Sequence, residues 1–198
     1  MIKYSQKNSR IETERLILRQ IQTKDIADIV ENINNIKISK WLLVVPYPYG
    51  RKDALFWINN SAKKAKEIPR KEYGFGIELK AEGRIIGGIS LHVSRQYDKS
   101  ATVGYWLGEK YWKFGYGSEA LEALIDLAFR KLKLKRLEAG VFAGNPSSGK
   151  LLEKFGFQEE GYKRQAMRCK ADGKLKDEYI YGLLSRQYKN PMKARRRK

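Results

Sequence analysis

A change in hydrophobic period near residue 115 restricts the fold of this chain more than any other feature. Upstream, the segments 84–93 and 101–107 are short apolar runs of the kind that form strands. From Ser118 onward, apolar residues recur at intervals of three and four, which is typical of a helix with one apolar stripe. These residues are Leu121, Leu124, Ile125, Ala128 and Leu132. The sequence therefore predicts a strand that leads through segment 111–118 into a long helix.

The rest of the chain alternates between the same two patterns. Further strands are expected at 15–19, 73–79, 136–143, 157–168 and 177–184. Further helices are expected at 25–33, 53–66 and 145–154. The last of these begins at Asn145-Pro146, a typical helix start, and ends before Gly156. This order of elements predicts an α/β fold in which helices flank a mixed sheet.

The length of 198 residues fits one domain with a single core. We expect a flexible lead at 1–11, one folded domain at 12–186 and a basic tail at 187–198. No apolar run is long enough for a signal peptide or a membrane span, so the protein is predicted to be cytoplasmic and not bound to a membrane. Cys169 is the single cysteine, which excludes an internal disulfide and a thiolate metal cluster.

The chain is strongly basic, with a formal net charge of +19. Such an excess attracts polyanions such as RNA and ribosomes. Part of it is concentrated at 193–198, in a segment without an apolar pattern. A solubilising end and an RNA-contacting tail explain this segment equally well, and both interpretations stay open.

Two glycine-containing junctions between a strand and a helix are candidate phosphate sites. In the first, segment 111–118 reads YWKFGYGS and contains Gly115 and Gly117. Glycines let the main chain turn tightly, so that backbone N–H groups at the start of the helix point at a pyrophosphate. Lys113 would add a mobile positive charge. A Gly-x-Gly before a helix is a weak signal when taken alone.

The second junction, GNPSSGKL at 144–151, has the spacing of a Walker A motif. Its last position is Leu151, where the motif needs Ser or Thr to hold magnesium. No later apolar strand ends in a suitable magnesium-binding Asp. The sequence therefore disfavours a nucleoside triphosphatase.

Taken together, the two junctions resemble the GNAT superfamily of acyl-CoA-dependent N-acetyltransferases, and in particular its ribosomal-protein (RimJ/RimL-like) branch. The resemblance covers about residues 12–185. It rests on ERLILR at 14–19, GYWL at 104–107, YW at 111–112, GYGSEAL at 115–121, Asn145 with Ser148, LEKFGF at 152–157 and DEYIYGLL at 177–184. The family pattern has Gly and then a basic residue after the tryptophan, whereas this chain has Lys113 and Phe114.

The resemblance implies a mixed, mostly antiparallel sheet that is splayed where strands 102–108 and 136–143 part to admit the pantetheine arm of acetyl-CoA. Segment 114–118 would hold the pyrophosphate, and the backbone of 106–108 would pair with the pantetheine amides. The implied cofactor-binding residues are Trp106, Leu107, Gly108, Trp112, Lys113, Phe114, Gly115, Tyr116, Gly117, Ser118, Asn145 and Ser148. No metal is required.

The resemblance also implies direct attack of an uncharged amine on the thioester in a ternary complex. Many members of the superfamily use a tyrosine as leaving-group acid, but Leu152 stands at that position here. Ser148 matches a serine that the ribosomal-protein branch places near the cofactor sulfur, with Asn145 holding pantetheine or a water. Both residues are equally well explained as the start of a helix.

The general base is less defined, because Gly140 stands where a carboxylate is often found. Glu138 lies on the same strand face and is the first candidate. Glu160, His92 and Tyr105 are the others. Met167 stands where some ribosomal-protein acetyltransferases have a carboxylate, so a water chain is a further possibility.

The acceptor amine is expected to enter opposite the cofactor, between the first two helices and the last hairpin. Aromatic residues and a proline in or near these segments are candidates for the wall: Trp41, Pro46, Tyr47, Tyr49, Trp57 and Tyr97. A protein N-terminus is favoured as the acceptor. The alternatives are a polyamine, aminoglycoside, amino acid or amino sugar, or a ribosome- or RNA-binding protein on a degenerate acetyltransferase fold.

Overall fold

The structure is a computed structural model that describes residues 2–4, 10–94 and 99–189. The strands within these ranges are β1 Lys3–Tyr4, β2 Arg10–Glu12, β3 Leu16–Arg19, β4 Glu72–Leu79, β5 Arg84–Val93, β6 Ser100–Leu107, β7 Arg136–Phe142, β8 Gln158–Arg168 and β9 Leu175–Leu184. The α-helices are α1 Ile26–Ile33, α2 Ile36–Ser39, α3 Arg51–Ala65, α4 Tyr116–Asp126 and α5 Pro146–Lys154. The basic segment 193–198 and Tyr97 lie outside the described residues.

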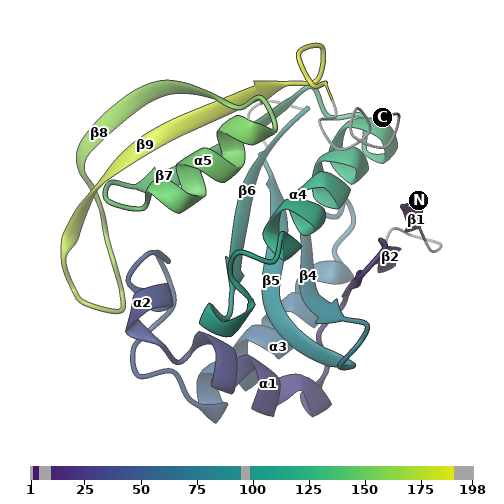
Figure 1. Cartoon of the computed structure of the whole chain (residues 1–198), viewed down its shortest axis with the longest axis vertical. Helices are drawn as coiled ribbons and strands as arrows, with labels where there is room; N and C mark the ends of the chain where they lie inside the picture. Colours follow the sequence, from purple (N-terminus) through teal and green to yellow (C-terminus); the bar gives the residue numbers. More distant parts are fainter. Residues whose placement is uncertain (1, 5–9, 95–98, 190–198) are drawn as a thin grey trace.

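The described strands form one sheet in the order β1-β2-β3-β4-β5-β6-β7-β9-β8. Neighbours are antiparallel except β6 and β7, which run parallel. Their pairing covers three residue pairs and ends at Thr102 opposite Glu138. Beyond that point β7 and the β8–β9 hairpin curve away from β6 (Figure 1). The predicted mixed, mostly antiparallel and splayed sheet is confirmed.

Two apolar clusters pack on opposite faces of the sheet. The larger cluster joins the strands to α4 and α5, with Leu121, Leu124 and Leu152 fully buried. The smaller one joins α1 and α3 to the other face, where Trp57 of α3 contacts Trp106 of β6 with ring centroids 6.2 Å apart. The sheet therefore separates an α4 and α5 face from an α1 and α3 face.

Three short elements were not expected from the sequence. Strands β1 and β2 lie in and next to segment 1–11, and Ile11 is fully buried against the main core. Helix α2 is a single turn that Asn35 caps by accepting a hydrogen bond from Lys37 N–H. Such short elements carry too few residues to show a periodic pattern.

Helix α4 keeps its apolar stripe to its end, where 127–131 continue it as one π-helical turn. Among the residues that the structure describes, no helix is both long and apolar enough to cross a lipid bilayer.

Candidate active site

The open edge of β6 is the backbone feature around which the candidate site is built. Gly108 N–H donates to Ile86 O of β5 at 2.9 Å. Because backbone groups of successive strand residues point to alternate sides, Trp106 also faces β5, while Tyr105 and Leu107 face the gap toward β7. The second half of β6 therefore presents strand backbone that has no paired strand on this side.

This geometry changes the predicted role of the 106–108 backbone. The carbonyl of Gly108 accepts a hydrogen bond from Tyr111 N–H at 3.0 Å, so both of its backbone groups have partners within the chain. Trp112 Nε1 donates to Leu107 O at 2.9 Å. Within 106–108, Leu107 is the residue whose backbone groups are directed into the gap. Tyr105, two residues earlier on the same strand, also directs its backbone groups there.

The loop between β6 and α4 contains two residues in left-handed conformation. Lys113 has a φ of 68° and Gly115 a φ of 82°. Lys113 occupies the position where the resembling family has glycine, and it keeps the backbone conformation that glycine favours. The loop thus turns tightly in spite of the substitution, and it places the first N–H groups of α4 at its inner side.

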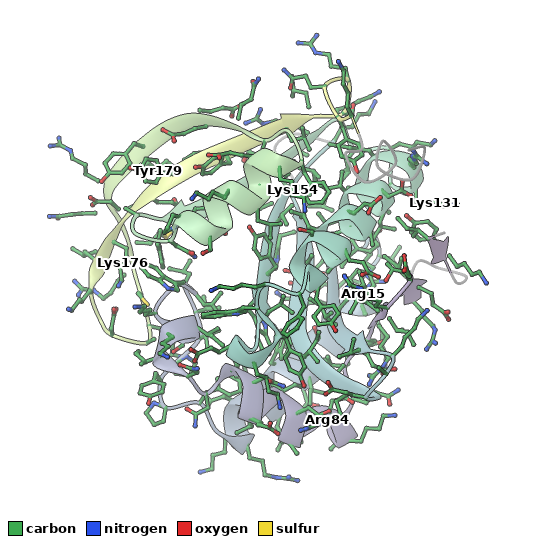
Figure 2. The ribbon with its side chains drawn as sticks, in the orientation of Figure 1. Arg15, Arg84, Lys131, Lys154, Lys176 and Tyr179 are labelled. Carbon is green, nitrogen blue, oxygen red and sulfur yellow. The ribbon has the colours of Figure 1, made fainter. Side chains whose placement is uncertain are left out.

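Arg15 holds this loop from outside, a contact that the sequence analysis did not anticipate (Figure 2). Its Nη1 donates to Phe114 O at 2.9 Å, and its guanidinium lies 4.6 Å from the Tyr116 ring centroid. Its Nε pairs with Glu119 of α4 at 2.7 Å. Glu119 also accepts from Thr13 Oγ1 and Arg15 N–H. Burial favours a higher pKa for Glu119, but these hydrogen bonds outweigh it and lower the pKa.

A second cation reaches the start of α4 from α5. Lys154 Nζ donates to Ser118 Oγ at 2.9 Å (Figure 2). Gly117 lies in the same corner, where a Cβ would come within 3.3 Å of Leu107 and 3.5 Å of Leu151. Lys113, Lys154 and the helix start therefore surround the loop with positive charge.

Ser148 of α5 and Tyr105 of β6 are in direct contact. The Tyr105 hydroxyl lies 2.7 Å from Ser148 Oγ and 3.2 Å from Ser148 O. Asn145 caps α5, since its Oδ1 accepts from Ser148 N–H at 3.4 Å. The structure thus brings Ser148 and Asn145 together at the gap and adds Tyr105 as the partner of Ser148.

Burial raises the pKa of Tyr105 to about 12. The phenol is therefore neutral at physiological pH and acts as a hydrogen-bond donor. This protonation state disfavours Tyr105 as the general base, one of the roles considered from the sequence.

Glu138 and Glu160 are both held by one arginine on the α1 and α3 face. Arg136 Nε donates to Glu138 at 2.7 Å, and Arg136 Nη1 donates to Glu160 at 3.0 Å. Hydrogen bonds from Arg136 lower the pKa of Glu160. Glu138 lies where the β6–β7 pairing ends, so it is near the gap, but its charge is balanced.

His92 lies on the same face and belongs to a small polar network. Its Nε2 is 3.1 Å from Ser90 Oγ, and its Nδ1 is 3.4 Å from Glu72. Glu72 in turn pairs with Lys64 of α3. His92 is exposed and pairs across the sheet with Thr102, a position at the closed end of the gap.

The predicted acceptor wall divides into buried and exposed members. Tyr49 is buried in the smaller core, and Trp57 packs on Trp106. Tyr47 is exposed. Trp41 lies at the mouth of the gap, where a Cβ on Gly144 would approach its ring to 3.2 Å.

The Walker A interpretation of 144–151 does not fit the structure. Residues 146–151 are the first turns of α5 and not an open loop. Gly149 is buried against Tyr181, whose hydroxyl would lie 2.9 Å from a Cβ at this position. Lys150 is exposed on the helix surface. No phosphate-cradling loop is formed here.

Comparison with known proteins identifies related chains. Residues 15–158 match the family model described as acetyltransferase (GNAT) domain. The uncharacterized N-acetyltransferase p20 of Bacillus licheniformis is 33% identical over 178 residues, which cover 89% of this chain and 96% of that protein. The ribosomal protein uS5-alanine N-acetyltransferase of Escherichia coli is 30% identical over 183 residues, covering 88% and 90%. A GNAT-family acetyltransferase structure from Bacillus anthracis superposes with a TM-score of 0.75 at 26% identity, covering 89% and 99%.

Proposed function

This chain belongs to the GNAT acetyltransferase family, and we propose that it transfers the acetyl group of acetyl-CoA to the N-terminal α-amine of a protein. It is an acetyl-CoA-dependent N-acetyltransferase. The observation that carries the rest of the proposal is the gap between β6 and β7, which is flanked by the 111–118 loop on one side and by Ser148 on the other.

The residues around the gap fit acetyl-CoA. The backbone groups of Tyr105 and Leu107 have the spacing that amides of an extended pantetheine arm need for strand-like pairing. The turned loop and the first N–H groups of α4 offer donors to a pyrophosphate, with Lys113 and Lys154 as nearby cations. Bound there, the thioester supplies the activated acetyl group.

We assign the leaving-group side of the reaction to Ser148. Ser148 is half-buried, and its hydrogen bond with the Tyr105 phenol links its hydroxyl to a neutral donor. In this arrangement Ser148 Oγ passes its proton to the departing sulfur as it takes the proton of the Tyr105 hydroxyl, and solvent then returns a proton to the phenol. Asn145 fixes the helix start on which Ser148 lies.

A protein α-amine is a suitable acceptor because of its pKa. We call the α1 and α3 face of the sheet, from which it would enter, the acceptor face. An N-terminal amine has a pKa of about 7.7–8.0, so a useful fraction is neutral at physiological pH, whereas the pKa of a lysine-like alkyl amine is about 10.4. The relative from Escherichia coli that is 30% identical is named for acetylating the alanine of ribosomal protein uS5. Trp41 at the mouth offers a flat contact for a peptide.

A small polyamine is the second candidate, because carboxylates gather on the acceptor face. Glu72, Glu138, Glu160 and Glu178 all lie there, on four different strands. Three of them are already neutralised by Lys64 or Arg136. The charge left for a polycationic ligand is therefore small, which favours the protein acceptor.

The test is acetylation of an amine panel measured by mass spectrometry. Peptides with N-terminal alanine or serine, the same peptides with a blocked N-terminus and an internal lysine, and spermidine would be supplied with acetyl-CoA. The proposal predicts kcat/KM for free N-terminal peptides at least about tenfold above the values for the others. Faster turnover of spermidine would overturn the protein acceptor, and a failure of acetyl-CoA to bind in calorimetry would overturn the donor site.

The formal charge of +19 supports a contact with the ribosome or its RNA in a cytoplasmic setting. The segment that concentrates this charge, 193–198, lies outside the described residues. Removing residues 191–198 is expected to weaken RNA binding and to reduce its salt dependence, as measured by fluorescence anisotropy at several salt concentrations. Unchanged affinity would mean that the tail has no part in it.

A further inference from the structure

Gly140 of β7 and Glu178 of β9 form an unusual pair on the acceptor face. A Cβ built on Gly140 would lie 2.7 Å from Glu178 Cδ and closer still to its Oε1. The carboxylate of Glu178 therefore occupies the space that a side chain at 140 would take. The missing side chain on one strand is replaced by a carboxylate from the next.

Glu178 also lies toward the end of the sheet at which β6 and β7 have separated. It pairs with Phe142, the last residue of β7, and the carbonyl of the preceding Asp177 accepts a hydrogen bond from Ala143 N–H at 2.9 Å. Two residues further, Asn145 begins α5, which carries Ser148. The carboxylate thus stands beside the open part of the gap, beyond the point at which β6 and β7 stop pairing.

Glu178 is the unpaired carboxylate of this face. Within ranges 10–94 and 99–189, its side chain forms no hydrogen bond or ion pair, although Lys163 is its cross-strand neighbour on β8. Glu160 fills the space over Gly182 in a similar way, with its Cδ 2.5 Å from a Cβ built there, but it is fixed by Arg136. Glu178 is partly exposed and has lone pairs available to a ligand.

We propose that Glu178 is the general base of this acetyltransferase, placed over Gly140 from the neighbouring strand. The inference rests on the proposed function and adds a residue to it. The acceptor nitrogen forms a bond to the acetyl carbon, the carbon–sulfur bond breaks, and one proton passes from the nitrogen to Glu178. The departing sulfur takes its proton from the Ser148–Tyr105 pair, Glu178 then releases its proton to solvent and the pair regains one, so amide and free thiol are the products and the enzyme is restored.

The general-base role makes Gly140 a positioning residue. A methyl group at 140 meets the far end of a flexible side chain, so Gly140→Ala displaces the carboxylate without disturbing the core. Gly140 is exposed, which also limits the cost to folding. The two residues therefore make a double-mutant cycle in which the second change has no effect once the carboxylate is absent.

The experiment measures kcat and KM for acetyl-CoA and for the acceptor peptide in Glu178→Gln, Gly140→Ala and the double variant. We expect kcat to fall about 100-fold in Glu178→Gln and about tenfold in Gly140→Ala, with the double variant equal to Glu178→Gln. The acid-side fall of kcat in the pH profile should disappear in Glu178→Gln. Glu159→Gln, a carboxylate on the same hairpin, is the matched control and should keep wild-type rates.

Two outcomes distinguish a failure of the Glu178 assignment from a failure of the proposed function. An active wild type with a Glu178→Gln variant whose kcat stays within about twofold would overturn the role of Glu178 alone. A wild type that acetylates no amine would overturn the proposed function and the inference that rests on it. Equal thermal midpoints of wild type and variants exclude misfolding as the cause of a lost rate.

Discussion

The two faces of the splayed sheet are built from different kinds of contact. On the α4 and α5 face, the candidate cofactor site consists of strand backbone, a turned loop and two helix starts, all within segments 104–118 and 145–154. On the α1 and α3 face, the polar groups come from strands β4, β7, β8 and β9, which extend over residues 72–184. The first face depends on local conformation and the second on strand order. Changes on the first should therefore affect binding, and changes on the second should affect turnover.

The largest expected effect tests the loop on the first face. Gly117→Glu would fill the corner between Leu107 and Leu151 and bring a negative charge to the phosphate donors. Calorimetry should show acetyl-CoA binding weakened at least about 100-fold, or ~2.7 kcal/mol. Gly161→Glu places the same side chain on β8, where nothing lies within 4 Å, and should bind normally. Wild-type affinity in Gly117→Glu would move the phosphate site elsewhere.

Ser148 lies on the first face but is assigned to the reaction itself, so its variant sharpens the comparison. Ser148→Ala removes the proposed proton donor and the partner of Tyr105 but keeps the helix start, which Asn145 caps. We expect kcat to fall about 10- to 100-fold while the Kd for acetyl-CoA stays within about twofold. Stopped-flow detection of free thiol measures the first and calorimetry the second. A normal kcat would remove Ser148 from the reaction.

A smaller effect is expected where the loop is held from outside. Arg15→Met removes the hydrogen bond to Phe114 O and the ion pair with Glu119. The loop should lose part of its fixed shape, and we expect the Kd for acetyl-CoA to rise about tenfold, or ~1.4 kcal/mol. Arg84→Met is the control, because it breaks two ion pairs, with Asp28 and Glu31 of α1, and has no contact with Phe114 or Glu119. If both variants bind acetyl-CoA equally well, Arg15 is not a loop-positioning residue.

The smallest effect is a difference in how stability depends on pH. Hydrogen bonds lower the pKa of Glu119 in the folded protein, so the stability that this group contributes is present above its unfolded pKa of about 4.3 and is lost as pH falls. Urea unfolding between pH 7 and pH 3 should show this decline. In Arg15→Met the decline should be shallower, because one cause of the lowered pKa is absent. An identical slope would show that Arg15 does not stabilise the charged carboxylate.

The contrast between the faces also explains what the sequence could reveal. The long helix after Gly117, the strand before it and the Asn145 cap follow from periodicity and local residue preferences, and the structure confirms them. The family match at 15–158 agrees with the resemblance based on these segments. Local patterns are readable because the contacts that they imply lie within a few residues.

The contacts that the sequence analysis missed join residues across long separations. Arg15 meets Glu119 over 104 residues, and Tyr105 meets Ser148 over 43. Glu178 fills the space at Gly140 because β9 lies next to β7 in a sheet order that differs from the order along the chain. Glu138 was the more visible candidate because it shares a strand with Gly140, yet Arg136 balances its charge. No local pattern encodes such pairings.

The central claim is that acetyl-CoA pairs with the open edge of β6, and amide hydrogen exchange measured residue by residue by NMR tests it most directly. The N–H groups of Tyr105 and Leu107 face the gap, whereas those of Gly104 and Trp106 already face β5. Saturating acetyl-CoA should slow exchange at Tyr105 or Leu107 at least about tenfold and leave Gly104 and Trp106 unchanged. Protection that falls on 144–150 but spares Tyr105 and Leu107 would contradict the account.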